Sequence, residues 1–149
     1  MADVAEVLER LVRLEDTMAI QRLLIDYGVH LDARDLHAYS RLFCEDGEWT
    51  GDTGSAIGPD AIQAMLEANL PPNPPAPGET TWHVMANPAV DVDGDRASAR
   101  VLWVLLRRDA GDVPGIAVTG HYEDLLARED GVWKFKRRAA FVDIGKPIE

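Results

Sequence analysis

The amino-acid sequence predicts an α+β fold in which helices pack on one face of a strongly curved antiparallel sheet. In the first part of the chain, apolar residues recur at the spacing of amphipathic helices. After about residue 80 the pattern changes to β-rich runs separated by short turns. Helices first and a sheet second is the order typical of α+β proteins.

Helices account for most of the chain before residue 70. Helical spacing from Val4 to about Leu31 predicts two consecutive helices or one bent helix, and Glu15-Asp16-Thr17 offers a cap for the second. A third helix is expected from Leu36 to about Cys44. Asp46–Gly51 is expected to form a turn that leads into a short strand. A further helix begins at Pro59, because proline is favoured in a first helical turn.

The second half of the chain contains four β-rich runs, preceded by a proline-rich segment. Five prolines in eight positions from Pro71 to Gly78 exclude a helix or a central strand, so this loop is either a solvated connector or a flap over a pocket. Turns rich in Asp and Gly separate the four runs, which predicts an antiparallel meander. The runs are Thr80–Val92, Arg96–Arg107, Ile116–Ala127 and Val132–Asp143.

Length and composition fit one domain spanning residues 1–149. The chain is 46% hydrophobic and 28% charged, which is ordinary for a globular protein. Its net charge of −11 repels phosphate backbones and anionic lipid surfaces, so neither nucleic acid nor a membrane is an expected partner. The basic run Lys134–Arg138 is interpreted as a solvated sheet face, because alternation on a strand sends neighbours to opposite sides.

Several features favour a cytoplasmic protein without a metal or cofactor. Cys44 is the single cysteine, which excludes an internal disulfide, and its apolar neighbours indicate a buried structural thiol. The N-terminus lacks the features of a signal peptide, and no apolar run approaches the roughly 18 residues of a membrane span. The four histidines show no metal-ligand spacing, and no glycine-rich phosphate cradle opens a helix.

Tyr27, Asp32 and His83 are the candidate catalytic residues. A carboxylate that accepts a hydrogen bond from one imidazole nitrogen fixes the tautomer and leaves the other nitrogen free to take a proton. A nearby phenol can donate to a developing oxyanion. Such a set serves proton abstraction followed by elimination or isomerisation. An acidic chain with four His and three Tyr offers many such combinations, so this interpretation depends on where the three residues lie in the fold.

Short segments along nearly the whole chain resemble one protein family. They are Ile20–Tyr27, Leu31–Asp35, Leu42–Trp49, Thr81–Pro88, Asp93–Ala97, Gly120–Asp124 and Asp130–Phe135. In this order they resemble the SnoaL-like branch of the nuclear-transport-factor-2-like superfamily. The resemblance implies a cone-shaped roll, in which a curved sheet wraps a long helix and leaves an apolar pocket open at one end.

The resemblance also implies roles for individual residues. Dehydratases, a dehydrochlorinase and polyketide cyclases share the fold, and several of these lyases use an Asp at the end of the long helix with a His on the first long strand. Asp32 and His83 match those positions, and Tyr27 matches a tyrosine that one dehydratase places five residues before its Asp. A second histidine on a middle strand, where this chain has Trp103, and a C-terminal arginine are not matched.

These observations predict a cofactor-independent lyase or isomerase, dehydratase-like, acting on a small hydrophobic cyclic or polyketide-like substrate. Dehydration, isomerisation and cyclisation use the same groups and stay open. The alternative is a non-catalytic small-molecule-binding or assembly module, since dioxygenase small subunits share the fold without a catalytic site. Alternation lets only one of His121 and Tyr122 face the pocket. The residues expected at the pocket besides the catalytic three are Trp49, Met85, Trp103, His121, Tyr122 and Phe135.

The sheet is also expected to support a homodimer or a higher homo-oligomer. Apolar residues occupy both faces of the strand from Arg96 to Arg107. The first set is Val101, Trp103 and Leu105, and the second is Leu102, Val104 and Leu106. If one set lines the cone, the other forms an apolar stripe that a second copy would cover.

Overall fold

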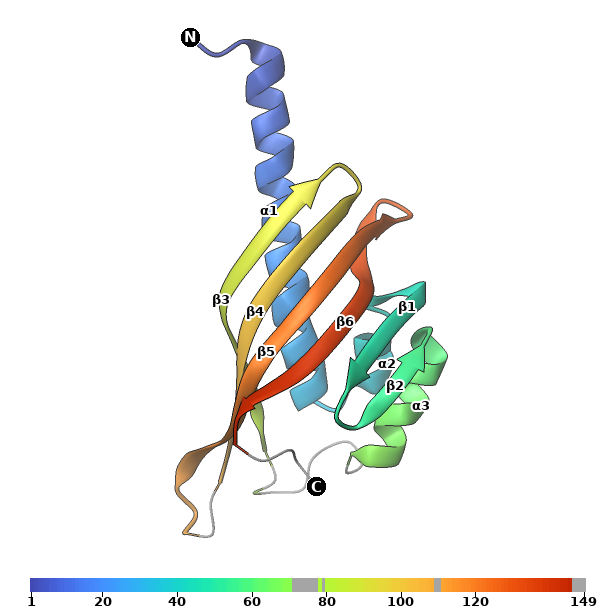
Figure 1. Ribbon diagram of the computed structural model, residues 1–149, viewed down its shortest axis with the longest axis vertical. Helices are drawn as coiled ribbons and strands as arrows, with labels where there is room; N and C mark the ends of the chain where they lie inside the picture. The colour runs from blue at the N-terminus through green and yellow to red at the C-terminus, as the bar shows by residue number, and fades with distance from the viewer. Residues whose placement is uncertain (71–77, 79, 109–110, 146–149) are drawn as a thin grey trace.

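The computed structural model describes residues 1–70, 78, 80–108 and 111–145, in which a long helix crosses one face of a six-stranded sheet (Figure 1). This helix, α1 (Val4–Asp32), is a single helix of 29 residues. The Asp3 side chain caps its N-terminus by accepting a hydrogen bond from the backbone N–H of Ala5. The first part of α1 extends beyond the sheet, and its C-terminal half is buried against the strands.

The continuous helix corrects the expectation of a second helix capped at Glu15-Asp16-Thr17. Asp16 is buried, and its carboxylate accepts hydrogen bonds from Trp133 Nε1 and Arg128 Nη2, each at 2.9 Å. An Asp side chain within a helix usually competes with the backbone for local hydrogen bonds. These two distant donors satisfy the Asp16 carboxylate, so the helical backbone continues through this position.

Two further helices and a short hairpin follow α1. They are α2 (Leu36–Ser40), β1 (Phe43–Gly51), β2 (Gly54–Ile57) and α3 (Pro59–Asn69). The helix expected to reach Cys44 ends earlier, because Phe43 already pairs with Phe135 of the last strand. The Cys44 side chain is buried, as expected, and α3 begins at the expected proline. No helix in the described ranges is long and apolar enough to cross a membrane.

The four long strands form the expected antiparallel meander. They are β3 (Trp82–Asp93), β4 (Arg96–Arg108), β5 (Pro114–Glu129) and β6 (Val132–Ile144). The strand order is β2-β1-β6-β5-β4-β3, and β1 runs parallel to β6, so the sheet is mixed and is not closed. The α+β architecture with a curved sheet around α1 is thereby confirmed (Figure 1). The predicted proline-rich flap or connector lies outside the described residues, apart from Gly78.

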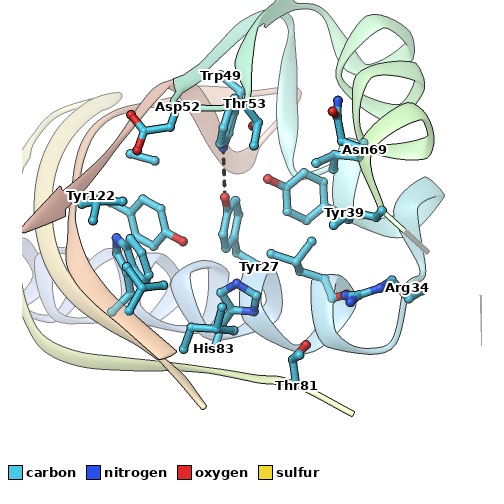
Figure 2. Close-up of a pocket in the computed structure, with 18 of the residues that line it drawn as sticks. Tyr27, Arg34, Tyr39, Trp49, Asp52, Thr53, Asn69, Thr81, His83 and Tyr122 are labelled. Atoms are coloured by element: carbon cyan, nitrogen blue, oxygen red, sulfur yellow. Dashed lines mark hydrogen bonds between the residues drawn. The ribbon is translucent and has the colours of Figure 1, made fainter. Parts of the chain in front are cut away.

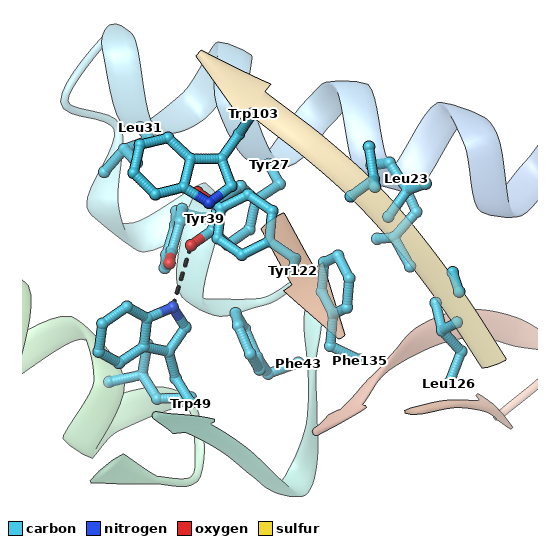
Figure 3. Packing of buried hydrophobic residues seen from close by; sticks show 14 of the residues in the cluster. Leu23, Tyr27, Leu31, Tyr39, Phe43, Trp49, Trp103, Tyr122, Leu126 and Phe135 are labelled. Atoms are coloured by element: carbon cyan, nitrogen blue, oxygen red, sulfur yellow. Dashed lines mark hydrogen bonds between the residues drawn. The ribbon is translucent and has the colours of Figure 1, made fainter. Parts of the chain in front are cut away.

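Aromatic rings from α1, α2 and the sheet fill the centre of the protein (Figure 3). The Tyr27 ring contacts Tyr39 at a centroid distance of 4.7 Å and Phe135 at 5.7 Å, and Phe43 lies 5.2 Å from Phe135. Tilted and edge-on contacts of this kind stabilise aromatic clusters beyond their burial alone. The cluster anchors the end of α1 that carries Asp32.

A buried ion pair lies directly beneath these rings. Arg138 Nε and Nη2 donate to the two carboxylate oxygens of Asp124, each at 2.7 Å, and both side chains are fully buried. The Arg138 guanidinium carbon also lies 4.0–4.2 Å from the ring centroids of Tyr27, Tyr122 and Phe135. Burial opposes the charge of Arg138, but the Asp124 carboxylate outweighs burial and raises the pKa of the guanidinium above its usual value.

The position of Arg138 corrects the interpretation of Lys134–Arg138 as a solvated face. Leu125 pairs with Arg137 and Leu126 pairs with Phe135, so Lys136 is an extra residue in β6. This bulge breaks the alternation, which leaves Lys136 and Arg137 exposed and turns Arg138 inward.

We predict that Arg138→Met lowers the free energy of unfolding by about 3–5 kcal/mol, because it leaves Asp124 as a buried charge without a partner. Arg137→Met is the matched control, since Arg137 is exposed and lies 3.8 Å from Glu48. That substitution should change the free energy by less than about 0.5 kcal/mol. Urea unfolding followed by circular dichroism measures both, and equal losses in the two variants would contradict this account.

The outer face of the sheet carries the expected apolar stripe. Val101, Trp103 and Leu105 are buried against the core, whereas Leu102, Val104 and Leu106 are half-buried on the opposite face. On β3, the exposed Val84 pairs with Val104, and the exposed Trp82 pairs with Leu106. An apolar face of this kind favours self-association through the sheet.

We predict that the chain dimerises through this face and that Val104→Lys converts the dimer to a monomer. Val12→Lys, which places the same change on the exposed part of α1, should leave the dimer intact. Sedimentation velocity at micromolar concentration measures both. A monomeric wild type, or dissociation by Val12→Lys alone, would contradict an interface on the sheet.

Candidate active site

A cavity of about 540 Å³ lies where the C-terminal end of α1, α2 and α3 meet the inner face of the sheet. Its walls are mostly apolar and include Leu31, Leu66, Leu105 and Val118. A volume of this size accommodates a small cyclic compound, and apolar walls with a few polar groups are typical of ligand sites. Figure 2 shows polar side chains pointing into this space from several elements.

Asp32 and His83 are joined by two hydrogen bonds beside this cavity. His83 Nδ1 lies 2.6 Å from Asp32 Oδ1, and the His83 backbone N–H donates to Asp32 Oδ2 at 2.8 Å. The ring distance falls within the range expected for a catalytic pair. In the described part of the chain, His83 Nε2 has no hydrogen-bond partner, and the ring lines the cavity with Asp32 behind it.

The small size of Gly28 allows α1 to approach β3 closely enough for this contact. A β-carbon at Gly28 would lie 3.0 Å from the His83 carbonyl oxygen and 3.2 Å from Met85 Cε. Both separations are shorter than ordinary van der Waals contact. A larger residue at position 28 would therefore require the His83 backbone to move by a few tenths of an ångström, at the strand position that holds His83 against Asp32.

The Tyr27 phenol lies at the centre of a group of three buried tyrosines. Tyr27 Oη accepts a hydrogen bond from Trp49 Nε1 at 3.0 Å, so the Tyr27 hydroxyl hydrogen is not used in that bond (Figure 2). Burial, and then the neighbouring Tyr27 phenol, raises the pKa of both Tyr39 and Tyr122 well above the usual value. These phenols therefore remain neutral hydrogen-bond donors at physiological pH.

Three residues expected at the pocket lie elsewhere. Phe135 is fully buried in the core, and Met85 packs beside Gly28, so neither lines the cavity. His121 points to the outer sheet face, where its Nδ1 lies 2.7 Å from Asp143 and its ring stacks on Phe141. The next residue on the strand, Tyr122, faces the cavity, as strand alternation requires. The expected residues that do line the cavity are Tyr27, His83, Trp49, Trp103 and Tyr122.

Several cavity residues were not predicted from the sequence. Tyr39, Arg34 and Thr81 line the cavity from α2, from the end of α1 and from the segment before β3. Arg34 and Thr81 each lie two residues from the Asp32–His83 pair, and that proximity was the available signal. Nothing in the local pattern marked Tyr39, because its burial depends on the contact of α2 with α1 and Phe43.

Within the described ranges, no group of three or more His, Cys, Asp or Glu side chains is arranged to hold a metal ion. Asp32 and His83 form a pair, and the His83 Nδ1 atom is directed at the carboxylate. The chemistry that these residues offer is proton transfer at Nε2 and hydrogen-bond donation from the phenols.

Residues 12–139 match the SnoaL-like domain, and the chain therefore belongs to the SnoaL-like family. The fold is that of nuclear-transport-factor-2-like proteins. A protein of this type with a cystatin-like fold from Novosphingobium aromaticivorans superimposes with a TM-score of 0.85 and is 28% identical, over 98% of this chain and 94% of its own.

Two further solved structures have the same fold, and a sequence relative covers most of the chain. LinA is 26% identical, with a TM-score of 0.77 over 93% of each chain. A scytalone-dehydratase-like protein from Novosphingobium aromaticivorans is 30% identical, with a TM-score of 0.72 over 89% of this chain and 87% of its own. An uncharacterized protein of Mycobacterium tuberculosis is 30% identical over 128 residues, which cover 84% of each chain.

We predict that neutral His83 carries its hydrogen on Nδ1, because Asp32 accepts from that nitrogen. Two-bond ¹H–¹⁵N NMR correlations report the tautomer directly. Asp32→Asn should shift the hydrogen toward Nε2, since the amide can donate to Nδ1. The exposed His37 serves as the control and should be unchanged, and a wild-type His83 protonated on Nε2 would contradict the assignment.

Proposed function

We propose that this protein is a cofactor-independent lyase or isomerase of the dehydratase type, acting on a small hydrophobic cyclic or polyketide-like substrate. The observation that carries the proposal is the hydrogen-bonded Asp32–His83 pair at the wall of a 540 Å³ cavity. His83 Nε2 is unpartnered among the described residues and the ring lines the cavity, so it has the position of a general base.

In the proposed reaction, His83 Nε2 takes a proton from a carbon α or vinylogous to a carbonyl. The electron pair of that C–H bond becomes the new C=C bond, and the bond to a β-hydroxyl breaks. The imidazolium is stabilised by Asp32 and returns its proton to the departing hydroxide, which leaves as water. The same groups catalyse an isomerisation when the proton returns to carbon instead.

The Tyr27 phenol is the proposed donor to the oxygen that gains charge. Its oxygen accepts from Trp49, and we assign its own hydrogen, which otherwise interacts with the neighbouring phenols of Tyr39 and Tyr122, to the substrate. General-base catalysis contributes about 10²–10⁴-fold, and a positioned donor in a dry site contributes a comparable factor. The apolar walls strengthen both effects by excluding water.

Two observations favour this proposal over a non-catalytic binding or assembly module. A binding module does not require Asp32 and His83 to be in contact, yet their side chains are 2.6 Å apart. Side chains leave a cavity of about 540 Å³ between the helices and the sheet. The similarity to LinA and to the scytalone-dehydratase-like protein supports the same class.

A panel of cyclic β-hydroxy ketones in D₂O, followed by NMR for deuterium incorporation and loss of water, tests the proposal. For a compound that reacts, His83→Ala should lower turnover by about 10²–10⁴-fold, because it removes the proton acceptor. Tyr27→Phe should cost least, since Tyr39 and Tyr122 are alternative donors. Asp32→Asn should fall between the two, because it perturbs the tautomer and cannot stabilise the imidazolium.

His121→Ala is the matched control for this series. His121 is also paired with an aspartate, Asp143 at 2.7 Å, but it lies on the outer sheet face. Its loss should leave turnover unchanged. If His83→Ala folded normally and kept full activity, the assignment of the base would be wrong. If no compound of the panel reacted but several bound, the binding-module alternative would be favoured.

A further inference from the structure

Arg34 is a buried guanidinium with no carboxylate partner in the described residues. Only 7% of the residue is exposed, and it lines the cavity. Its Nη1 donates to the Leu31 carbonyl oxygen at 2.7 Å, whereas Nε has no hydrogen-bond partner. The ion pairs within the described ranges involve other arginines. A buried cation without an anion is costly, so this position calls for a negative group from elsewhere.

The backbone at Arg34 is also unusual for this residue type. Arg34 has φ 58°, and the end of α1 closes with Arg34 N–H donating to Leu31 O and Asp35 N–H donating to His30 O. Those two bonds define a Schellman ending, in which the residue at this position is commonly glycine. Position 34 is occupied by arginine although its left-handed backbone conformation favours glycine. Backbone strain of this kind is often found at functional sites.

Two more unpaired donors face the same cavity. Thr81 Oγ1 and Trp103 Nε1 are buried, line the cavity and have no hydrogen-bond partner among the described residues. Arg34 lies two residues after Asp32 in the sequence, and Thr81 lies two residues before His83. Because Asp32 and His83 are hydrogen-bonded, these two donors are brought to the same part of the cavity. Figure 2 shows Arg34 and Thr81 on the same side of the cavity as His83. Buried donors of this kind are normally satisfied, so their clustering points to an acceptor supplied by a ligand.

The charges that line the cavity differ in sign from the protein as a whole. Among the described lining residues, Arg34 and Arg107 are cationic and Asp52 is a carboxylate. The whole chain has a net charge of −11. A cationic lining inside an acidic protein favours an anionic ligand locally, because the low dielectric of the cavity strengthens nearby charges more than distant ones.

We propose that the substrate carries a carboxylate and that Arg34 is its counter-ion, with Thr81 as a second donor. This inference rests on the proposed function for the identity of the reacting end of the molecule. The carboxylate anchors one end of an apolar ring system, and the ring lies over His83. The carbonyl that acidifies the transferred proton then faces the phenols of Tyr27, Tyr39 and Tyr122. The substrate class is therefore a cyclic oxo acid.

A merely structural role for Arg34 makes a different prediction. An arginine that only caps the end of α1 through the Leu31 carbonyl affects stability and does not discriminate between charged and neutral ligands. Binding of a matched pair of probes separates the two roles. We choose 2-naphthoate and 2-naphthamide, which share a flat apolar bicycle and differ in charge.

Isothermal titration at pH 7 should show that the wild type binds naphthoate about tenfold or more tightly than naphthamide, as for a charge-assisted hydrogen bond. Arg34→Gln should remove that preference. Arg34→Gly should also remove the preference for naphthoate. This variant should fold normally, because glycine adopts the positive φ of position 34 without strain. Arg22→Gln removes one positive charge from an exposed position on α1 and should leave the preference intact.

His83→Ala separates this inference from the proposed function. A carboxylate preference that persists in His83→Ala, together with an absence of turnover in the wild type, would contradict the lyase assignment and support the role of Arg34. No preference in the wild type, or a preference retained in both Arg34 variants, would overturn the role of Arg34. So would a preference that is lost only in Arg107→Gln, since Arg107 is the other cationic residue described at the cavity.

Discussion

The Arg138–Asp124 ion pair sets the arrangement of the aromatic groups around it. Its guanidinium is fully buried and contacts the faces of Tyr27, Tyr122 and Phe135 at 4.0–4.2 Å. Arg138 Nη1 has no hydrogen-bond acceptor in the described part of the chain, and these ring faces attract its charge. A buried ion pair contributes little net stability compared with apolar packing, but it accepts few alternative arrangements. Its main consequence is the fixed direction of two pocket phenols.

The contact between α1 and β3 connects this core to the proposed chemistry. Asp32 uses both carboxylate oxygens on His83, one for the ring and one for the backbone N–H. The carboxylate therefore fixes the strand as well as the imidazole. Gly28 permits this approach, because any β-carbon there would meet the His83 carbonyl at 3.0 Å. The geometry of the base depends on helix–strand packing as much as on the two side chains.

The two His–Asp pairs found in the described ranges show why contact alone does not define a site. The His121–Asp143 pair is 2.7 Å apart and the His83–Asp32 pair 2.6 Å apart, so their hydrogen bonds are equivalent. His121 stacks on Phe141 on the outer face of the sheet, whereas His83 borders a cavity whose lining includes Arg34 and buried phenols. Both imidazole side chains are 14% exposed, so the difference between them is that His83 borders a cavity large enough for a small ligand. The cavity gives the inner pair its proposed function.

The sequence by itself determined the order of helices and strands, the meander and the turns, because these follow from local periodicity. Family resemblance supplied the pairing of Asp32 with His83. The tertiary structure alone decided the features that depend on distant partners. Asp16 stays within one helix because Trp133 and Arg128 satisfy it, and Arg138 turns inward because the pairing of β5 with β6 leaves Lys136 as an extra residue. Arg34 likewise becomes a buried cation without a carboxylate partner among the described residues only where α1 ends against the cavity, since no local pattern records which side chains meet in space.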